Sequence, residues 1–207
     1  MKRLPAFAGL FGLTACPGPP PTNGLVRCDA TVVTDIDETL TVSDEEFIEQ
    51  ALDATYVPEM RPEANAAMQA WVDAGQRVVY VTARGAENVL DDGRTVFEAT
   101  DDWLDLHGFP RSTGDLLLAP EGPVFGEDAI AHKTTTLGAL QDAGADLVAA
   151  YGNSESDLEA YTAVGLTTDQ IWVVGELAGD PRGQAIPDAD AYSAHRAALT
   201  PPTACVP

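Results

Sequence analysis

Five short apolar runs recur along the chain, and each one ends in polar residues or glycine. Their β-branched and aliphatic residues, bounded by turn formers, are typical of buried strands. Longer segments with apolar residues near helical spacing separate them. The sequence therefore predicts strands at 30–34, 77–82, 115–119, 146–151 and 171–174, with helices at 63–74, 95–107, 132–144 and 158–164 and a weaker one at 191–199.

The alternation of strands and helices predicts an α/β fold. Each connection is long enough to hold a helix, which favours a five-stranded parallel sheet covered on both faces, a three-layer Rossmann-like arrangement. Residues 42–58 are polar and mixed, and we expect a short flap or helical turn there. At 207 residues the chain has room for one such domain and not for two of ordinary size.

Polar side chains follow the predicted strands. Asp35 and Asp37 come directly after the first strand, Thr82 ends the second, Lys133 opens the helix after the third, and Asp157 follows the fourth. The carboxyl ends of parallel strands meet at one edge of a sheet, where ligands bind in open α/β folds. We therefore expect these side chains to converge on one site.

The pair Asp35 and Asp37 stands out within this set. In an extended chain the two carboxylates point to the same side, while Ile36 points to the other. A solvated turn is the usual explanation for two aspartates after a strand. Here Thr39 completes a D-x-D-x-T pattern, which favours a catalytic pair.

The first residues read as a secretory signal rather than as part of the fold. Lys2 and Arg3 precede an apolar stretch of about ten residues, too short to span a bilayer. The segment ends in Leu-Thr-Ala-Cys16, which resembles the lipobox of bacterial lipoproteins. We expect a signal peptide at 1–15, a lipidated Cys16 with a Pro-rich tether at 16–27, and the domain at 28–207. A plain signal peptide that contains a cysteine is the alternative.

These features predict an exported protein of the bacterial cell envelope, held to a membrane by its lipid. In such a compartment the two remaining cysteines, Cys28 and Cys205, are more often a disulfide than two thiols. A bridge would pin the C-terminal tail beside the first strand.

The formal net charge of −22 disfavours one class of partner. Such a surface repels nucleic acid, so binding through a basic patch is disfavoured. Solubility or a saline habitat is the favoured explanation of this charge, and a need for bound divalent cations is a minor one.

The four polar positions after the strands, namely the Asp35 and Asp37 pair, Thr82, Lys133 and Asp157, match in order the motifs of a known superfamily. It is the haloacid dehalogenase (HAD) superfamily of aspartate-nucleophile phosphohydrolases, which the chain resembles. Within it the chain looks most like the LNS2 catalytic domain of lipins, the Mg²⁺-dependent phosphatidate phosphatases. It departs from lipins at Glu38, where Gly is usual, and at Ser154, where Arg is usual. The resemblance is carried by Thr34-Asp35-Ile36-Asp37 with Thr39 and Thr41, Thr82-Ala83-Arg84, residues 116–120, Lys133, and residues 149–153 with Ser156-Asp157 and Ala160-Tyr161.

This resemblance implies a phosphoric monoester hydrolase. Asp35 would be the nucleophile that forms an aspartyl-phosphate. Asp37 would protonate the leaving alkoxide and then activate water. Thr82 and Lys133 would hold the phosphoryl oxygens. Mg²⁺ would be bound by Asp35, the backbone carbonyl of Asp37 and Asp157, with Asn153 as an alternative ligand.

The gaps between the motifs are too short for a separate cap domain, so the resemblance implies a capless site. An open site accepts a phosphate presented by something large or embedded, such as a phospholipid. Three hypotheses follow: a phosphatase of phosphatidate-like lipids, a phosphatase of soluble esters or nucleotides, and a non-catalytic phosphatidate-binding module. Retention of both Asp35 and Asp37 argues against the third.

We predict that the mature protein carries lipid on Cys16 and a Cys28–Cys205 disulfide. Intact-mass spectrometry, with and without reduction, measures both. An unmodified Cys16 contradicts the anchor, and two alkylatable thiols in the exported protein contradict the bridge.

Overall fold

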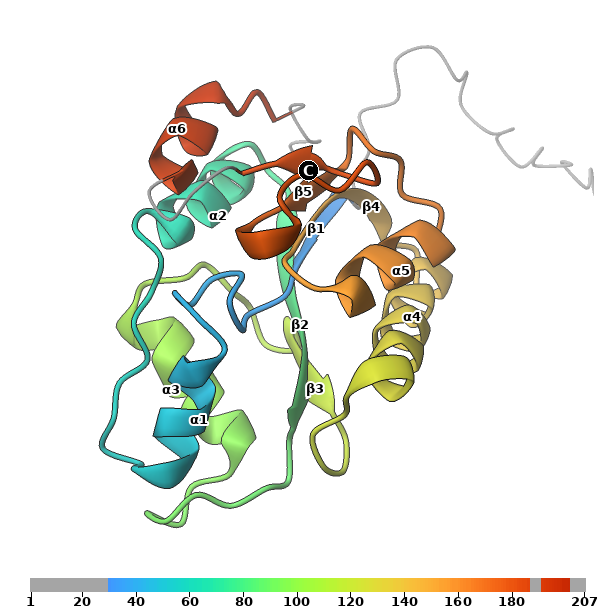
Figure 1. The fold of residues 1–207 in the computed structure, drawn as a ribbon. Coiled ribbons are helices and arrows are strands. Elements are labelled where there is room, and N and C mark those ends of the chain that lie inside the picture. The colour runs from blue at the N-terminus through green and yellow to red at the C-terminus, as the bar shows by residue number, and fades with distance from the viewer. Residues whose placement is uncertain (1–29, 187–190, 202–207) are drawn as a thin grey trace, which may run out of the picture.

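The computed structural model describes residues 30–186 and 191–201. Its centre is a parallel sheet with strand order β3-β2-β1-β4-β5-β6 (Figure 1). Each strand corresponds to one apolar run except the last. The strands are β1 (Ala30–Thr34), β2 (Arg77–Gly85), β3 (Leu116–Ala119), β4 (Asp146–Gly152), β5 (Ile171–Val173) and β6 (Gln184–Ala185).

The predicted three-layer fold is confirmed, but the sheet has six strands where the sequence predicted five. The sixth, β6, pairs with β5 through Trp172 and Val173. It has two residues, one of them Gln184, so it leaves no apolar run in the sequence.

Helices cover both faces of the sheet, as Figure 1 shows: α4 and α5 on one side, and α2, α3 and α6 on the other. The side chains of β1 alternate accordingly, because Val32 packs in the cluster that includes α2 and Val33 in the cluster that includes α4 and α5. The helices are α1 (Glu45–Leu52), α2 (Ala64–Asp73), α3 (Val96–Leu106), α4 (Gly126–Asp142), α5 (Glu155–Ala163) and α6 (Ala191–Ala198), with a 3₁₀ turn, η1 (Gly175–Leu177).

Two helix predictions needed correction. The expected flap at 42–58 contains a regular helix, α1, with Glu46 and Gln50 on its buried side. The helix predicted to open at 132 begins at Gly126, because residues 126–131 are helical without an apolar repeat. Lys133 therefore lies inside α4 and not at its start.

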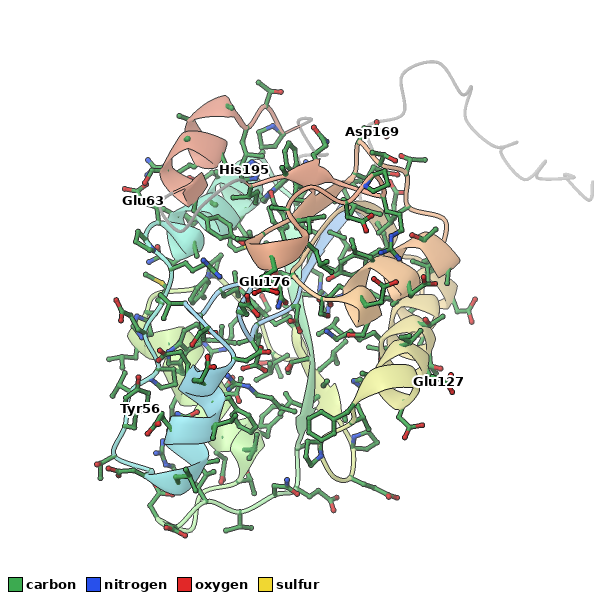
Figure 2. All side chains as sticks on the ribbon, viewed as in Figure 1. Tyr56, Glu63, Glu127, Asp169, Glu176 and His195 are labelled. Carbon is green, nitrogen blue, oxygen red and sulfur yellow. The ribbon has the colours of Figure 1, made fainter. Side chains whose placement is uncertain are left out.

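The predicted signal peptide, Cys16, the tether, Cys28 and Cys205 all fall outside the described residues. Among the residues described, no helix has both the length and the apolar character needed to span a bilayer. Acidic side chains are spread over the surface: the four labelled in Figure 2, Glu63, Glu127, Asp169 and Glu176, are exposed on four different segments.

A buried polar chain joins α2, β4 and α6. Trp71 Nε1 donates to the Tyr151 hydroxyl over 2.8 Å, and that hydroxyl lies 2.8 Å from His195 Nε2. His195 is only 8% exposed, and burial lowers the pKa of its imidazole to about 4. The fold therefore holds this histidine neutral.

The buried imidazole predicts acid destabilisation. Between pH 6.5 and 4 the unfolded chain binds a proton that the folded chain excludes, so stability falls as the pH drops. After allowance for solvent screening we expect a loss of roughly 2 kcal/mol attributable to His195. Urea unfolding at pH 7 and pH 4 of the wild type and of His195→Gln measures it. If the variant loses as much stability as the wild type over this interval, His195 is not the cause.

Candidate active site

The structure brings the predicted polar residues together at the carboxyl edge of the sheet. Lys133 Nζ donates to Asp35 Oδ1 over 2.9 Å and to Asp157 Oδ1 over 2.6 Å. All three residues are at most 4% exposed. The loop after β1, the helix α4 and the helix α5 thus meet in one buried ion cluster.

The cluster has a distinct electrostatic character. Burial, reinforced by Asp157, raises the pKa of Asp35 to about 8, while Lys133 acts in the opposite direction. Burial also disfavours the Lys133 ammonium, but the Asp157 and Asp35 carboxylates outweigh this and raise its pKa. The charged lysine is therefore the feature that favours ionised Asp35 in this pocket.

Asp157 is anchored on both sides. Its Oδ2 accepts from the backbone N–H groups of Asn153 and Ser154 and from Ser154 Oγ, at 3.2, 3.1 and 2.7 Å. Ser154 and Asp157 form a capping box at the start of α5. A Cβ on Gly152 would lie 2.5 Å from Asp157 Cβ, so glycine is required for this approach.

Asp35 is held differently. Lys133 engages its Oδ1, which leaves Oδ2 without a hydrogen-bond donor among the described residues. Asp35 also lines a cavity of about 380 Å³. One carboxylate oxygen is thus positioned by the protein, and the other is available to a ligand.

Arg84 is a site residue to which the sequence assigned no role. Its Nε donates to Asp37 Oδ2 over 3.0 Å and its Nη2 to Asp37 Oδ1 over 2.7 Å. The guanidinium also donates to Thr100 Oγ1 and lies 4.4 Å from the centre of the Phe47 ring. The position of the arginine two residues after Thr82, in the same motif, was the available signal.

Thr82 lies beneath Asp37 and not on the cavity wall. Its hydroxyl is 3.3 Å from Asp37 Oδ2, and it is fully buried. Asn153 does line the cavity, and its amide oxygen accepts from Thr39 Oγ1 over 2.9 Å. The structure therefore places Asn153 at the cavity and Thr82 one layer below it.

The cavity has a polar floor and an apolar rim. Asp35, Lys133 and Asn153 belong to the floor. The rim is formed by Phe47 and Ile48 of α1 and by Pro123, Val124 and Phe125 before α4. Ile48 is 54% and Phe125 77% exposed, so apolar surface adjoins the cavity.

The described residues contain no group of three or more His, Cys, Asp or Glu side chains placed to hold a metal ion. The cavity is nevertheless lined by other oxygen-bearing side chains, namely those of Asp35, Asp37, Asp44 and Asn153. Carboxylate, amide and main-chain oxygens are the ligands that Mg²⁺ prefers, and Mg²⁺ usually keeps several waters. The donors present therefore fit a hard divalent cation.

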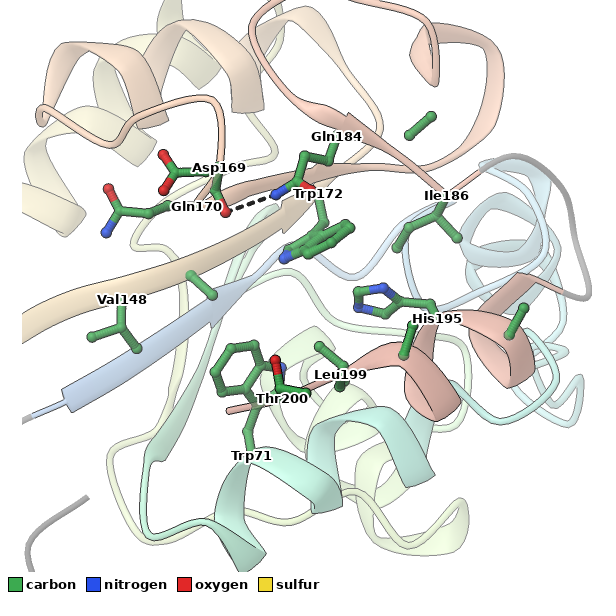
Figure 3. A pocket seen from close by; sticks show the side chains of 14 residues that line it. Trp71, Val148, Asp169, Gln170, Trp172, Gln184, Ile186, His195, Leu199 and Thr200 are labelled. Carbon is green, nitrogen blue, oxygen red and sulfur yellow. Dashed lines mark hydrogen bonds between the residues drawn. The ribbon is translucent and has the colours of Figure 1, made fainter. Parts of the chain in front are cut away.

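A second, larger cavity of about 600 Å³ lies away from these residues (Figure 3). Trp71, Trp172 and His195 are among its lining residues, and none of the predicted catalytic or metal-binding residues reaches it. It is bordered by Ile186 and Thr200, close to the ends of the described segments.

Comparison with known proteins identifies the domain. Residues 32–175 match the profile of the family described as PITM 1-3, LNS2 domain. The chain is 34% identical over 143 residues to the protein retinal degeneration B of Drosophila melanogaster, covering 69% of this chain and 10% of that protein. It is 28% identical over 148 residues to the membrane-associated phosphatidylinositol transfer protein 3 of Mus musculus, covering 69% and 13%. The chain thus spans about a tenth of these relatives.

Solved structures show the same fold. A D,D-heptose 1,7-bisphosphate phosphatase from B. bronchiseptica, complexed with magnesium and phosphate, is similar with a TM-score of 0.56 and 17% identity, over 80% of this chain and 97% of that one. A HAD-like phosphatase from Mesorhizobium loti has a TM-score of 0.51 and 20% identity, over 81% and 84%. The expected HAD fold with an LNS2-type sequence is therefore confirmed.

Proposed function

The chain belongs to the family of PITM 1-3 LNS2 domains, which it builds on a HAD-type fold, and from this premise we propose that it is a divalent-cation-dependent phosphomonoester hydrolase with Asp35 as nucleophile. One observation carries the proposal. Asp35 has one oxygen held by a buried lysine and the other available at a cavity. That is the arrangement a carboxylate needs to attack phosphorus.

In the first half of the reaction Asp35 Oδ2 attacks phosphorus, and the bond to the alkoxide leaving group breaks. Asp37 donates a proton to the departing oxygen. In the second half Asp37 takes a proton from water, which attacks the aspartyl-phosphate, releases inorganic phosphate and restores Asp35. Arg84 orients Asp37 through two hydrogen bonds, and Lys133 offsets negative charge beside Asp35.

A bound Mg²⁺ would neutralise charge on the phosphoryl oxygens. Asp35, the backbone carbonyl of Asp37, and Asn153 or Asp157 would hold it. Of the last two, Asp157 is fully buried, has both oxygens hydrogen-bonded and does not line the cavity, whereas Asn153 does line it. Asn153 is the better direct ligand, and Asp157 serves as the anchor of Lys133.

We predict that Asp35→Asn lowers kcat/KM towards an aryl phosphate at least about a thousandfold, because an amide cannot form the covalent intermediate. A chelator should abolish wild-type turnover, and Mg²⁺ should restore it. Glu127→Gln, an exposed change at the start of α4, is the matched control and should keep full activity. Turnover that persists in Asp35→Asn excludes Asp35 as the nucleophile.

The apolar rim supports a lipid substrate. A phosphomonoester bound to the floor would extend its organic part past Phe47, Ile48 and Phe125. Contact with acyl chains would remove these side chains from water, at about 25 cal/mol for each Å² of apolar surface buried. A phosphatidate-like ester, presented in the membrane to which Cys16 would tether an exported domain, meets this requirement.

We predict that Phe125→Ser lowers kcat/KM for phosphatidate in mixed micelles about tenfold and leaves that for an aryl phosphate unchanged. Leu106→Ser, on α3 and 67% exposed, is the matched control, since Leu106 does not line the cavity. Turnover of nucleotide or sugar monophosphates ten times better than phosphatidate would identify a soluble-ester phosphatase instead. Binding of phosphatidate without any turnover would identify a lipid-binding module.

A further inference from the structure

Glu38 occupies a backbone conformation that normally requires glycine. Its φ is +54°, and only Glu63, at +62°, shares this feature among the non-glycine residues described. The left-handed region costs an ordinary residue about 1 to 2 kcal/mol. Hydrogen bonds on both sides hold Glu38 there: its N–H donates to Thr41 Oγ1 over 2.8 Å, and its carbonyl accepts from Arg61 Nε over 2.9 Å.

The strained position directs the Glu38 side chain to Asn153. Asn153 Nδ2 donates to Glu38 Oε2 over 3.1 Å, while Asn153 Oδ1 accepts from Thr39 Oγ1 over 2.9 Å. Because an ionised carboxylate can only accept, this pair of contacts determines which end of the amide is oxygen. The amide is therefore locked in one orientation at the wall of the catalytic cavity.

The neighbouring chain leaves room for this side chain. A Cβ on Gly175 would lie 2.9 Å from Glu38 Oε1 and 3.8 Å from Asn153 Cβ. Gly175 itself has a φ of +77°. Gly175, in the turn after β5, therefore leaves the space that the contact between Glu38 and Asn153 needs.

We propose that Glu38 is a positioning residue that orients the Asn153 amide oxygen towards a divalent cation and so strengthens cation binding in the catalytic cavity. The inference rests on the proposed function for the identity of the cation. Glu38 acts through Asn153, from a loop that also carries Asp35 and Asp37. It thereby couples the loop after β1 to the loop after β4.

The test compares Glu38→Gly and Glu38→Gln with the wild type. Mg²⁺ binding is measured without substrate, by calorimetry and by the rise in Tm on adding Mg²⁺, and separately as the Mg²⁺ concentration that gives half-maximal turnover. Glu38→Gly should weaken Mg²⁺ binding about tenfold, or about 1.4 kcal/mol. Its Tm without Mg²⁺ should barely change, since relief of backbone strain offsets the flexibility of glycine. Glu38→Gln, which can still accept from Asn153, should bind Mg²⁺ nearly as well as the wild type.

Two controls separate positioning from other effects. Glu63→Gly removes the other left-handed glutamate, at the exposed start of α2, and should leave Mg²⁺ binding unchanged. In an Asn153→Ala background, Glu38→Gly should cause no further loss, because its effect passes through that amide.

Wild-type Mg²⁺ affinity in Glu38→Gly overturns the inference, as does a full tenfold loss in the Asn153→Ala background or in Glu38→Gln. Failure of the proposed function gives a different set of results from failure of the positioning role. In that case the wild type hydrolyses no phosphomonoester, while the Mg²⁺-dependent Tm shift and its loss in Glu38→Gly are still observed and support the positioning role.

Discussion

The buried contact of Lys133 with Asp35 and Asp157 is the constraint on which the structure depends. Removing each charge from water costs several kcal/mol, and only good geometry offsets this. Three segments must therefore meet accurately: the loop after β1, the middle of α4 and the first turn of α5. The parallel sheet provides that meeting point, because β1 and β4 are neighbours and end at the same edge. The same geometry makes the two carboxylates unequal. Both oxygens of Asp157 accept hydrogen bonds, whereas Lys133 engages only one oxygen of Asp35.

A second layer of contacts orients Asp37, the proposed general acid. Arg84 holds Asp37 with two nitrogens and is itself held by Thr100 and covered by Phe47. Phe47 belongs to α1, which also contributes Ile48 to the apolar rim. The helix that forms one side of the apolar rim thus also covers the arginine that holds Asp37. Under the proposed function, changes in α1 would alter both substrate preference and proton transfer.

Sequence patterns were sufficient to predict the features that depend on residues adjacent in the chain. The apolar run of β1 and the spacing of Asp35 and Asp37 located the edge of the sheet, and the start of α5 was visible around Asp157. The pattern did not reveal β6, whose pairing depends on the neighbouring β5 rather than on its own two residues. It also misplaced the start of α4, because Gly126 begins that helix without an apolar repeat. The part played by Arg84 depends on side-chain directions across 47 residues of chain, which no local pattern encodes.

Charge balance at the cavity supports the proposal of a bound cation. Of the described residues that line it, Lys133 and Arg84 are the basic ones, and each is already paired with a carboxylate. Asp35, Asp37 and Asp44 line the same cavity, so an incoming phosphate meets more negative than positive charge. The chain's net charge of −22 adds a long-range repulsion that salt screens only in part. A divalent cation at Asp35 would reverse the local balance. The two departures from lipins both adjoin the candidate ligand Asn153, since Glu38 accepts from its amide and Ser154 caps the helix that follows it. These substitutions would therefore act on the immediate surroundings of the proposed cation, where a small change in orientation has the largest electrostatic effect.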